Sequence, residues 1–180
     1  MAEEIRKLAE KLPLSKKISE EALKIYKEIE TEPFPKEYKA ETSIYLACDK
    51  YSCALVRKLP KPKSKILRRA RKKTGIMPNL EAIDRVDAIC ELINKGKNVS
   101  RKAKEILKKY KEKYPSDYYG KAPSITAAAA VYIASKLCGE PISQDELREY
   151  LGITTLSIRN RYRDIAEKLP SEYSWLIRFL

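Results

Sequence analysis

The decapeptide ITAAAAVYIA, residues 125–134, is apolar at nearly every position. A helix that is apolar on all sides is buried, and small alanine side chains let neighbouring helices approach closely. The run is too short to cross a membrane, which takes roughly 20 apolar residues. It therefore predicts a central helix with other helices packed around it. A pocket for a small molecule lined by the same apolar stripe is the alternative.

The first half of the chain carries a weaker copy of this pattern. The segment YLACDK at 45–50 echoes YIASK at 132–136, and ISxxAxxIY at 18–26 recurs as VSxxAxxIL at 99–107. Self-similarity of this kind indicates a duplicated structural unit. The connection before the second central helix, Tyr114–Lys121, is longer than its counterpart and is expected to be a loop.

Only 5 glycines interrupt a chain rich in Lys, Glu, Leu, Ala and Ile, which favours helix over sheet. Apolar periodicity and Pro/Gly breaks place helices at about residues 3–12, 19–31, 37–55, 62–73, 79–95 (capped by Asn79), 100–113, 123–138, 143–151 and 155–169, with a short tail at 171–180. We predict an all-α fold of two tandem five-helix units. Their bounds are residues 1–77 and 78–180, with Ser43–Ala47 and Ala127–Ala134 as the buried hubs.

The charge balance points to a polyanionic partner. Lys and Arg total 38 against 25 for Asp and Glu, a net charge of +13. Nucleic acid is the first candidate and an anionic membrane surface the second. A Lys-rich surface that serves solubility or thermal stability is the third interpretation.

Several function classes find no support in the sequence. The chain has no histidine, and its four cysteines form no C-x-x-C pair, so we expect four buried thiols and no metal site. Without a P-loop or a glycine-rich nucleotide fingerprint, neither an enzyme nor a cofactor is expected. No stretch has the length or apolarity of a signal peptide core or a membrane span. A soluble, intracellular protein is predicted.

Residues 142–163, ISQDELREYLGITTLSIRNRYR, have the pattern of a helix-turn-helix. Ser143 and Glu146 fit a capping box that starts a short helix, and Gly152 supplies the turn. Thr154 or Thr155 then caps the next helix.

The second helix of this motif has two opposed faces. At ~100° per residue, a core face falls within an arc of about 60°; it consists of Ile158, Tyr162, Ile165 and Leu169. The outward face carries Leu156, Asn160 and Arg163, with Arg159 on its flank. Folding alone explains an exposed leucine poorly, whereas in a DNA major groove Leu contacts thymine methyls, Arg binds guanine and Asn pairs with adenine. A packing unit without DNA contact is the alternative.

Residues 57–73, RKLPKPKSKILRRARKK, hold ten basic and no acidic residues. As a helix, this run would anchor through Ile66, Leu67 and Ala70 and display its remaining basic side chains. Like charges on one helix face repel each other, so phosphate contact is predicted. A solvated face, a localisation signal and an acidic protein partner are the alternatives. The other basic stretch, residues 95–113, mixes Lys with Glu and fits an ordinary exposed helix.

The segments GKAPSITAAAAVYIASKL (120–137) and ISQDELREYLGITTLSIRNRYRDIAEKL (142–169) closely resemble the second cyclin-like repeat of the transcription factor B family, archaeal and eukaryotic. The resemblance is strong over about residues 97–169, and residues 5–74 resemble the first repeat in outline. It implies two cyclin-like repeats, the second ending in a helix-turn-helix. It also implies binding of double-stranded promoter DNA together with TATA-binding protein.

In this family the final helix-turn-helix reads the B recognition element upstream of TATA, and its reading positions correspond here to Leu156, Ser157 and Arg159. The expected base-reading residues are Leu156, Ser157, Arg159, Asn160 and Arg163. The expected phosphate contacts are Lys65, Arg68, Arg69, Lys72, Lys73, Thr155 and Arg161. A cyclin-like protein–protein interaction module that does not read DNA is the alternative function.

Two departures from the family bear on partners. The sequence contains no zinc ribbon, the part through which the family engages RNA polymerase, so no polymerase contact of the usual kind is expected if this is the complete protein. The first repeat's DNA helix is replaced by PKPKSKILRRARKK. The sequence is thus either a core fragment or a divergent viral or regulatory variant. Its expected location is the cytoplasm of an archaeal or virus-infected cell, or the nucleus in a eukaryote.

Overall fold

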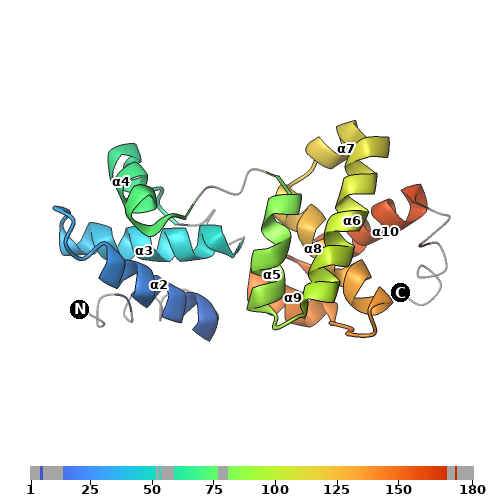
Figure 1. Ribbon diagram of the computed structural model, residues 1–180, viewed down its shortest axis with the longest axis horizontal. Helices are drawn as coiled ribbons and strands as arrows, with labels where there is room; N and C mark the ends of the chain where they lie inside the picture. The colour runs from blue at the N-terminus through green and yellow to red at the C-terminus, as the bar shows by residue number, and fades with distance from the viewer. Residues whose placement is uncertain are drawn as a thin grey trace. The chain divides into compact units, whose positions relative to one another are not determined.

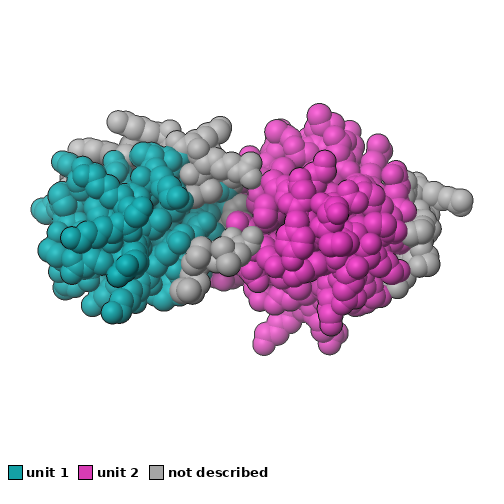
Figure 2. Space-filling model, turned by 90° about the horizontal axis from the view of Figure 1, so that it is seen from above, with its two compact units in different colours: residues 1–78 teal, residues 79–180 magenta. Residues whose placement is uncertain are grey.

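The computed structural model describes residues 5, 14–51, 53, 59–76, 81–169 and 173. The chain divides into two compact units, Met1–Pro78 and Asn79–Leu180 (Figure 2), a division one residue beyond the boundary expected from the sequence. Every regular element in the described residues is a helix, and none of these residues forms a strand, which confirms the all-α prediction.

Unit 1 contains α2 (Lys16–Glu28), α3 (Lys36–Lys50) and α4 (Ser64–Thr74) (Figure 1). The Oγ of Ser15 caps α2 by accepting a hydrogen bond from the backbone N–H of Ile18. The middle helix, α3, packs against both α2 and α4. Within it the predicted hub Ser43–Ala47 is buried except at Tyr45, which is half-buried. Of the helix predicted at 3–12, only Ile5 is described, and it is helical and buried.

Unit 2 has α8 as its centre. Its elements are the 3-10 turn η2 (Ile83–Arg85), α5 (Val86–Leu92), α6 (Lys97–Lys113), α7 (Pro115–Tyr119), α8 (Pro123–Leu137), α9 (Gln144–Leu151) and α10 (Thr155–Lys168). The central α8 contacts α5, α6, α7 and α10 (Figure 1). All of Ala127–Ala134 is buried, as predicted for a hub. The proposed cap Asn79 lies outside the described residues.

The echo between the two halves corresponds to equivalent packing. The echoed positions Ile18 and Ala22 of α2 are fully buried, as are Val99 and Ala103 of α6. The other echoed segments lie in α3 and α8, the middle helix of unit 1 and the centre of unit 2. The echoed segments of α2 and α6 therefore pack through the same positions, each in its own unit.

The prediction of a loop over Tyr114–Lys121 was wrong, because this segment contains α7. Pro115 occupies the first turn of α7, where a missing N–H costs nothing. The ring of Tyr118 is buried, and its hydroxyl accepts a hydrogen bond from the backbone N–H of Ile83 at 3.2 Å. This tertiary contact stabilises a helix of only five residues, which is too short to show periodicity in the sequence.

The helix-turn-helix forms as predicted from α9 and α10, which pack against each other. The Oγ of Ser143 accepts from the backbone N–H of Glu146 at 3.1 Å, and the Glu146 carboxylate accepts from the Ser143 N–H at 2.8 Å. Gly152 ends α9 with a φ of 64°, a left-handed conformation that favours glycine. Of the two candidate caps for α10, Thr154 is the one used: its Oγ1 accepts from the Ser157 N–H.

The two faces of α10 also agree with the helical-wheel prediction. The predicted core residues Ile158, Tyr162, Ile165 and Leu169 are all buried. Leu156, two positions before Ile158, has 62% of its surface exposed. Two branched apolar side chains on the same helix thus lie in opposite environments.

Ile158 and Leu156 give a matched test of how α10 is placed in the fold. Replacing Ile158 by Ala should lower the free energy of unfolding by about 2–5 kcal/mol, because it leaves a cavity in a closed core. Leu156→Ala removes a side chain that lies mostly in water and should shift the melting temperature little. Thermal melts of both variants followed by circular dichroism check this. Equal melting temperatures for the two variants would contradict the placement of α10.

Candidate nucleic-acid interface

The outward face of α10 brings most of the predicted base-reading residues together. Leu156, Arg159, Asn160 and Arg163 are all exposed, and Ser157 is half-buried at the edge of this face. The hydroxyl of Ser157 lies 2.8 Å from that of Thr154, so it takes part in capping the helix. Within the part of the chain that is described, no acidic group pairs with Arg159 or Arg163. These guanidinium groups are free to bind a partner.

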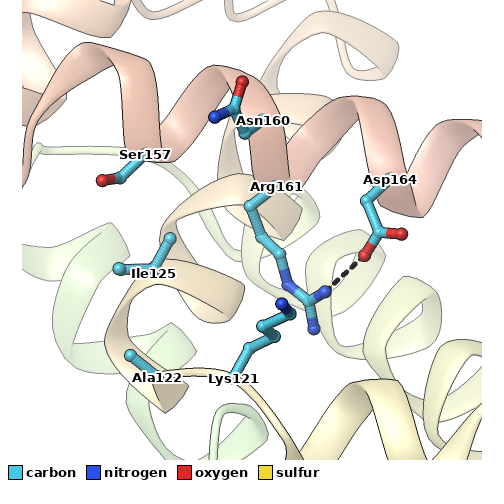
Figure 3. Close-up of a pocket in the computed structure, with 7 residues that line it drawn as sticks. All are labelled: Lys121, Ala122, Ile125, Ser157, Asn160, Arg161 and Asp164. Carbon is cyan, nitrogen blue, oxygen red and sulfur yellow. Dashed lines mark hydrogen bonds and ion pairs between the residues drawn. The ribbon is translucent and has the colours of Figure 1, made fainter.

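A hollow of about 280 Å³ lies beside this face, between α10 and the start of α8 (Figure 3). Lys121, Ala122 and Ile125 line it from the α8 side, and Ser157, Asn160, Arg161 and Asp164 line it from α10. The sequence did not single out Lys121, because its proximity to α10 arises from tertiary packing. The one sequence feature that could have identified it is a basic residue two positions before the start of the central helix.

Arg161 lies in a different environment from the one expected for a phosphate contact. Its side chain is only 5% exposed, and its guanidinium points from α10 towards the body of unit 2 (Figure 3). Its position on the helical wheel is beside the core face, about 60° from Ile158 at ~100° per residue. The long side chain therefore turns inward, and the structure assigns it to packing instead of to the exposed face.

The inward-pointing guanidinium is hydrogen-bonded to four other groups. Nε donates to Thr126 Oγ1 at 3.1 Å, Nη1 donates to the Tyr110 hydroxyl at 3.2 Å and to the Asp164 carboxylate, and Nη2 donates to the Asp117 carbonyl at 2.8 Å. These partners come from α6, α7, α8 and α10. One side chain of the candidate reading helix thus contacts three other helices of its unit.

The protonation states of this cluster suit its hydrogen bonds. Burial, followed by the hydrogen bond to Asp164, raises the pKa of Tyr110 to about 12, so its hydroxyl stays protonated. Burial alone would raise the pKa of Asp164, but hydrogen bonds from Lys168 and Tyr110 and the charge of Arg161 outweigh it and lower this pKa. Asp164 is therefore an anion that balances the buried Arg161 cation at neutral pH.

In unit 1, α4 displays the predicted basic surface. Five of the predicted phosphate contacts are exposed on it: Lys65, Arg68, Arg69, Lys72 and Lys73. Among the described residues only Arg69 of these five has an acidic partner, Glu32 at 3.5 Å. Arg71 instead anchors the helix through Asp49 at 2.8 Å. Arg57 and Lys58, at the start of the basic run, lie outside the described residues.

The lysines of α6 differ from those of α4 because acidic groups neutralise them locally. Lys102 and Lys109 both pair with Glu105, Lys104 pairs with Asp87, and Lys111 pairs with Glu81. This agrees with the interpretation of residues 95–113 as an ordinary exposed helix. The unneutralised basic side chains of α4 are the stronger candidate for binding an anion.

Two of the four cysteines, Cys48 and Cys53, lie close enough to form a side-chain hydrogen bond with each other. Cys48, Cys53 and Cys90 are buried free thiols, whereas Cys138 is half-buried, contrary to the expectation of four buried thiols. Burial raises the pKa of Cys90 to about 12, which suppresses its thiolate form. The described residues contain no group of three His, Cys, Asp or Glu side chains placed to hold a metal ion. Within the same residues, no helix has the length and apolarity needed to cross a membrane.

Comparison with known proteins places the helix-turn-helix unit in a family. The family model described as "Transcription factor TFIIB repeat" matches residues 77–168, just over half of the chain. A transcription initiation factor IIB from Methanosarcina mazei is 32% identical over 186 residues, which cover 94% of this chain and 53% of that protein. The factor of the same name from Pyrococcus abyssi is 33% identical over 184 residues, 92% of this chain and 60% of its own length.

A third relative is similar over a shorter stretch at higher identity. A transcription initiation factor IIB from Archaeoglobus fulgidus is 41% identical over 97 residues, 54% of this chain and 29% of that protein. This chain spans about half the length of the first two relatives. All three names are those of initiation factors and not of enzymes. With its all-helical fold and a family match that covers the whole helix-turn-helix, the chain belongs to the transcription factor TFIIB repeat family.

Proposed function

We propose that this chain binds double-stranded promoter DNA as the core of a transcription factor B, with α10 reading bases in the major groove. The observation that carries the proposal is the exposed face of α10, where Leu156 lies beside Arg159 and Arg163, two cations that pair with no acidic group in the described part of the chain. The relatives named transcription initiation factor IIB support the same role.

The chemistry of this face suits base edges. An arginine can donate two parallel hydrogen bonds to the O6 and N7 atoms of guanine, and an asparagine can pair with adenine in the same way. A leucine can contact the methyl group of thymine. In water, by contrast, the largely exposed Leu156 contributes little to stability, and the two arginines have no acidic partner among the described residues. A face of this composition is therefore accounted for by a DNA groove better than by folding.

Phosphate contacts would supply most of the affinity. We assign them to Lys65, Arg68, Arg69, Lys72 and Lys73 on α4, together with Thr155 in the first turn of α10, where backbone N–H groups favour an anion. Arg161 is left out of this set because its guanidinium is buried and hydrogen-bonded to four groups within unit 2. Lys121, across the hollow from Asn160, is added to the set.

TATA-binding protein is the proposed protein partner, on the basis of family membership. The second candidate function is a cyclin-like protein interaction module, for which the same exposed Leu156 would be a docking residue. The two functions differ in one measurable property. A base-reading helix distinguishes one DNA sequence from another, whereas a docking surface for protein does not.

Replacing Arg159 by Ala should weaken binding to the preferred DNA site by roughly 1–3 kcal/mol, because its two hydrogen bonds to guanine are lost. Binding to scrambled DNA should weaken much less. Leu156→Ala should act in the same direction but more weakly, since a methyl contact buries little apolar area. Binding isotherms on a site selected from random duplexes, and on its scrambled version, measure both effects.

Arg101→Ala on α6 is the matched control, since it also removes one exposed arginine from unit 2. It should leave the ratio of the two affinities unchanged. Equal weakening on every DNA by Arg159→Ala would mean that α10 holds only the backbone. Unaltered DNA binding by Arg159→Ala would favour the interaction module.

The basic surface of α4 predicts a steep dependence of DNA affinity on salt. Each phosphate contact releases condensed counterions and adds about 0.9 to the slope of log K against log salt. Replacing Arg68, Arg69, Lys72 and Lys73 together by Gln should flatten this slope on all sequences alike.

The control for this variant removes the same charge from α6 by replacing Lys102, Lys104, Lys109 and Lys111 with Gln. These lysines are paired with acidic groups, so their loss should change the slope much less. Equal flattening by both variants would show that net charge, and not the surface of α4, determines the salt dependence. An unchanged slope in the α4 variant would exclude α4 from the phosphate contacts.

A further inference from the structure

We propose that Arg161 is a positioning residue: it fixes the rotation of α10 about its axis and so sets base preference without touching DNA. This inference rests on the proposed base-reading function. It starts from an unusual placement, a guanidinium buried in the core on the same helix that presents unpaired arginines to solvent. Arg161 lies between Asn160 and Arg163 in sequence, so any rotation of α10 that moves one of these residues also moves the others.

The geometry of the contacts restricts this rotation. The guanidinium group is planar, and its N–H donors point in fixed directions. Here they are directed to Thr126 Oγ1 on α8, the Tyr110 hydroxyl on α6, and the Asp117 carbonyl on α7. Three fixed acceptors on three surrounding helices can all be reached in only one orientation of the arginine.

Burial makes these hydrogen bonds difficult to exchange for others. At 5% exposure the guanidinium cannot replace a lost partner with bulk water, and an unpaired buried charge is costly. The apolar contacts of Ile158 and Tyr162 hold α10 against α8, but apolar contacts are non-directional. Packing decides which face of α10 is buried, and the directed hydrogen bonds of Arg161 restrain the rotation of the helix further.

The restraint matters because base recognition depends on small displacements. Hydrogen bonds weaken steeply once their distance and angle depart from ideal values. A recognition site must be held to within about 0.5 Å of its productive geometry by side chains behind it. The exposed ends of Arg159 and Asn160 lie away from the axis of α10, so a few degrees of helix rotation would displace them from the base edges that they are proposed to contact.

Three variants test the inference. Arg161→Lys keeps the charge but loses the planar guanidinium and its fixed donors. Tyr110→Phe removes one hydroxyl that accepts from Arg161, and Thr126→Val replaces another by a methyl group of similar size. For each, the ratio of affinities for the selected and scrambled duplexes is measured well below its melting temperature. The slope of affinity against salt is measured on the scrambled duplex. The two partner variants retain the Arg161 charge and serve if Arg161→Lys fails to fold.

Arg161→Lys should reduce the affinity ratio roughly tenfold, about the value of one base contact, and leave the salt slope unchanged. Tyr110→Phe and Thr126→Val should each reduce the ratio by a smaller factor. In an Arg159→Ala background, Arg161→Lys should reduce the ratio much less than it does alone, because the main contact that it positions is already absent.

Three results would overturn the inference. A salt slope lowered by about 0.9 in Arg161→Lys would mean that Arg161 contacts a phosphate itself. Lower melting temperatures with an unchanged affinity ratio in all three variants would leave Arg161 a purely structural role. Additive effects of Arg161→Lys and Arg159→Ala would show that the two side chains act separately. The base-reading proposal fails by a different result, an unchanged ratio in Arg159→Ala alone.

Discussion

Residues 126–135 of α8 are all buried, and this burial determines the arrangement of unit 2. A helix without a polar face must be covered by other helices, and here α5, α6, α7 and α10 cover it. Covering α8 commits the apolar face of α10, led by Ile158 and Tyr162, to the core. The opposite face then has to lie in solvent, and it carries Leu156 and Arg159. The candidate site is thus a consequence of how the hub is packed.

The basic side chains differ in whether they meet an acidic group within their own unit. The lysines of α6 meet acidic groups within their own unit, so their charge is neutralised at short range. The buried Arg161 is balanced by Asp164, whose lowered pKa keeps it ionised at neutral pH. Most of the exposed basic side chains of α4 meet no acid among the described residues. The positive charge that remains unpaired on α4 and α10 is therefore available to a polyanion.

Much of this structure could be predicted from the sequence, because helical periodicity and capping patterns are local properties. The core and outward faces of α10, the capping box at Ser143 and the hub at Ala127–Ala134 are of this kind. Features that depend on tertiary contacts could not be predicted. The formation of α7 depends on a hydrogen bond from Ile83 to Tyr118, and Lys121 is brought beside α10 only by folding. The burial of Arg161, expected as a phosphate contact, could not be predicted either, because a charged residue at the edge of a core face can turn inward or outward.

The central claim, that this chain binds promoter DNA together with TATA-binding protein, is tested most directly by a gel mobility shift. A TATA-containing duplex is titrated with the chain alone, with TATA-binding protein alone and with both proteins at moderate salt. We expect a slower band with both proteins than with either one, at concentrations of the chain that leave a scrambled duplex free. Identical mobility with and without the chain, on both duplexes and down to low salt, would contradict it.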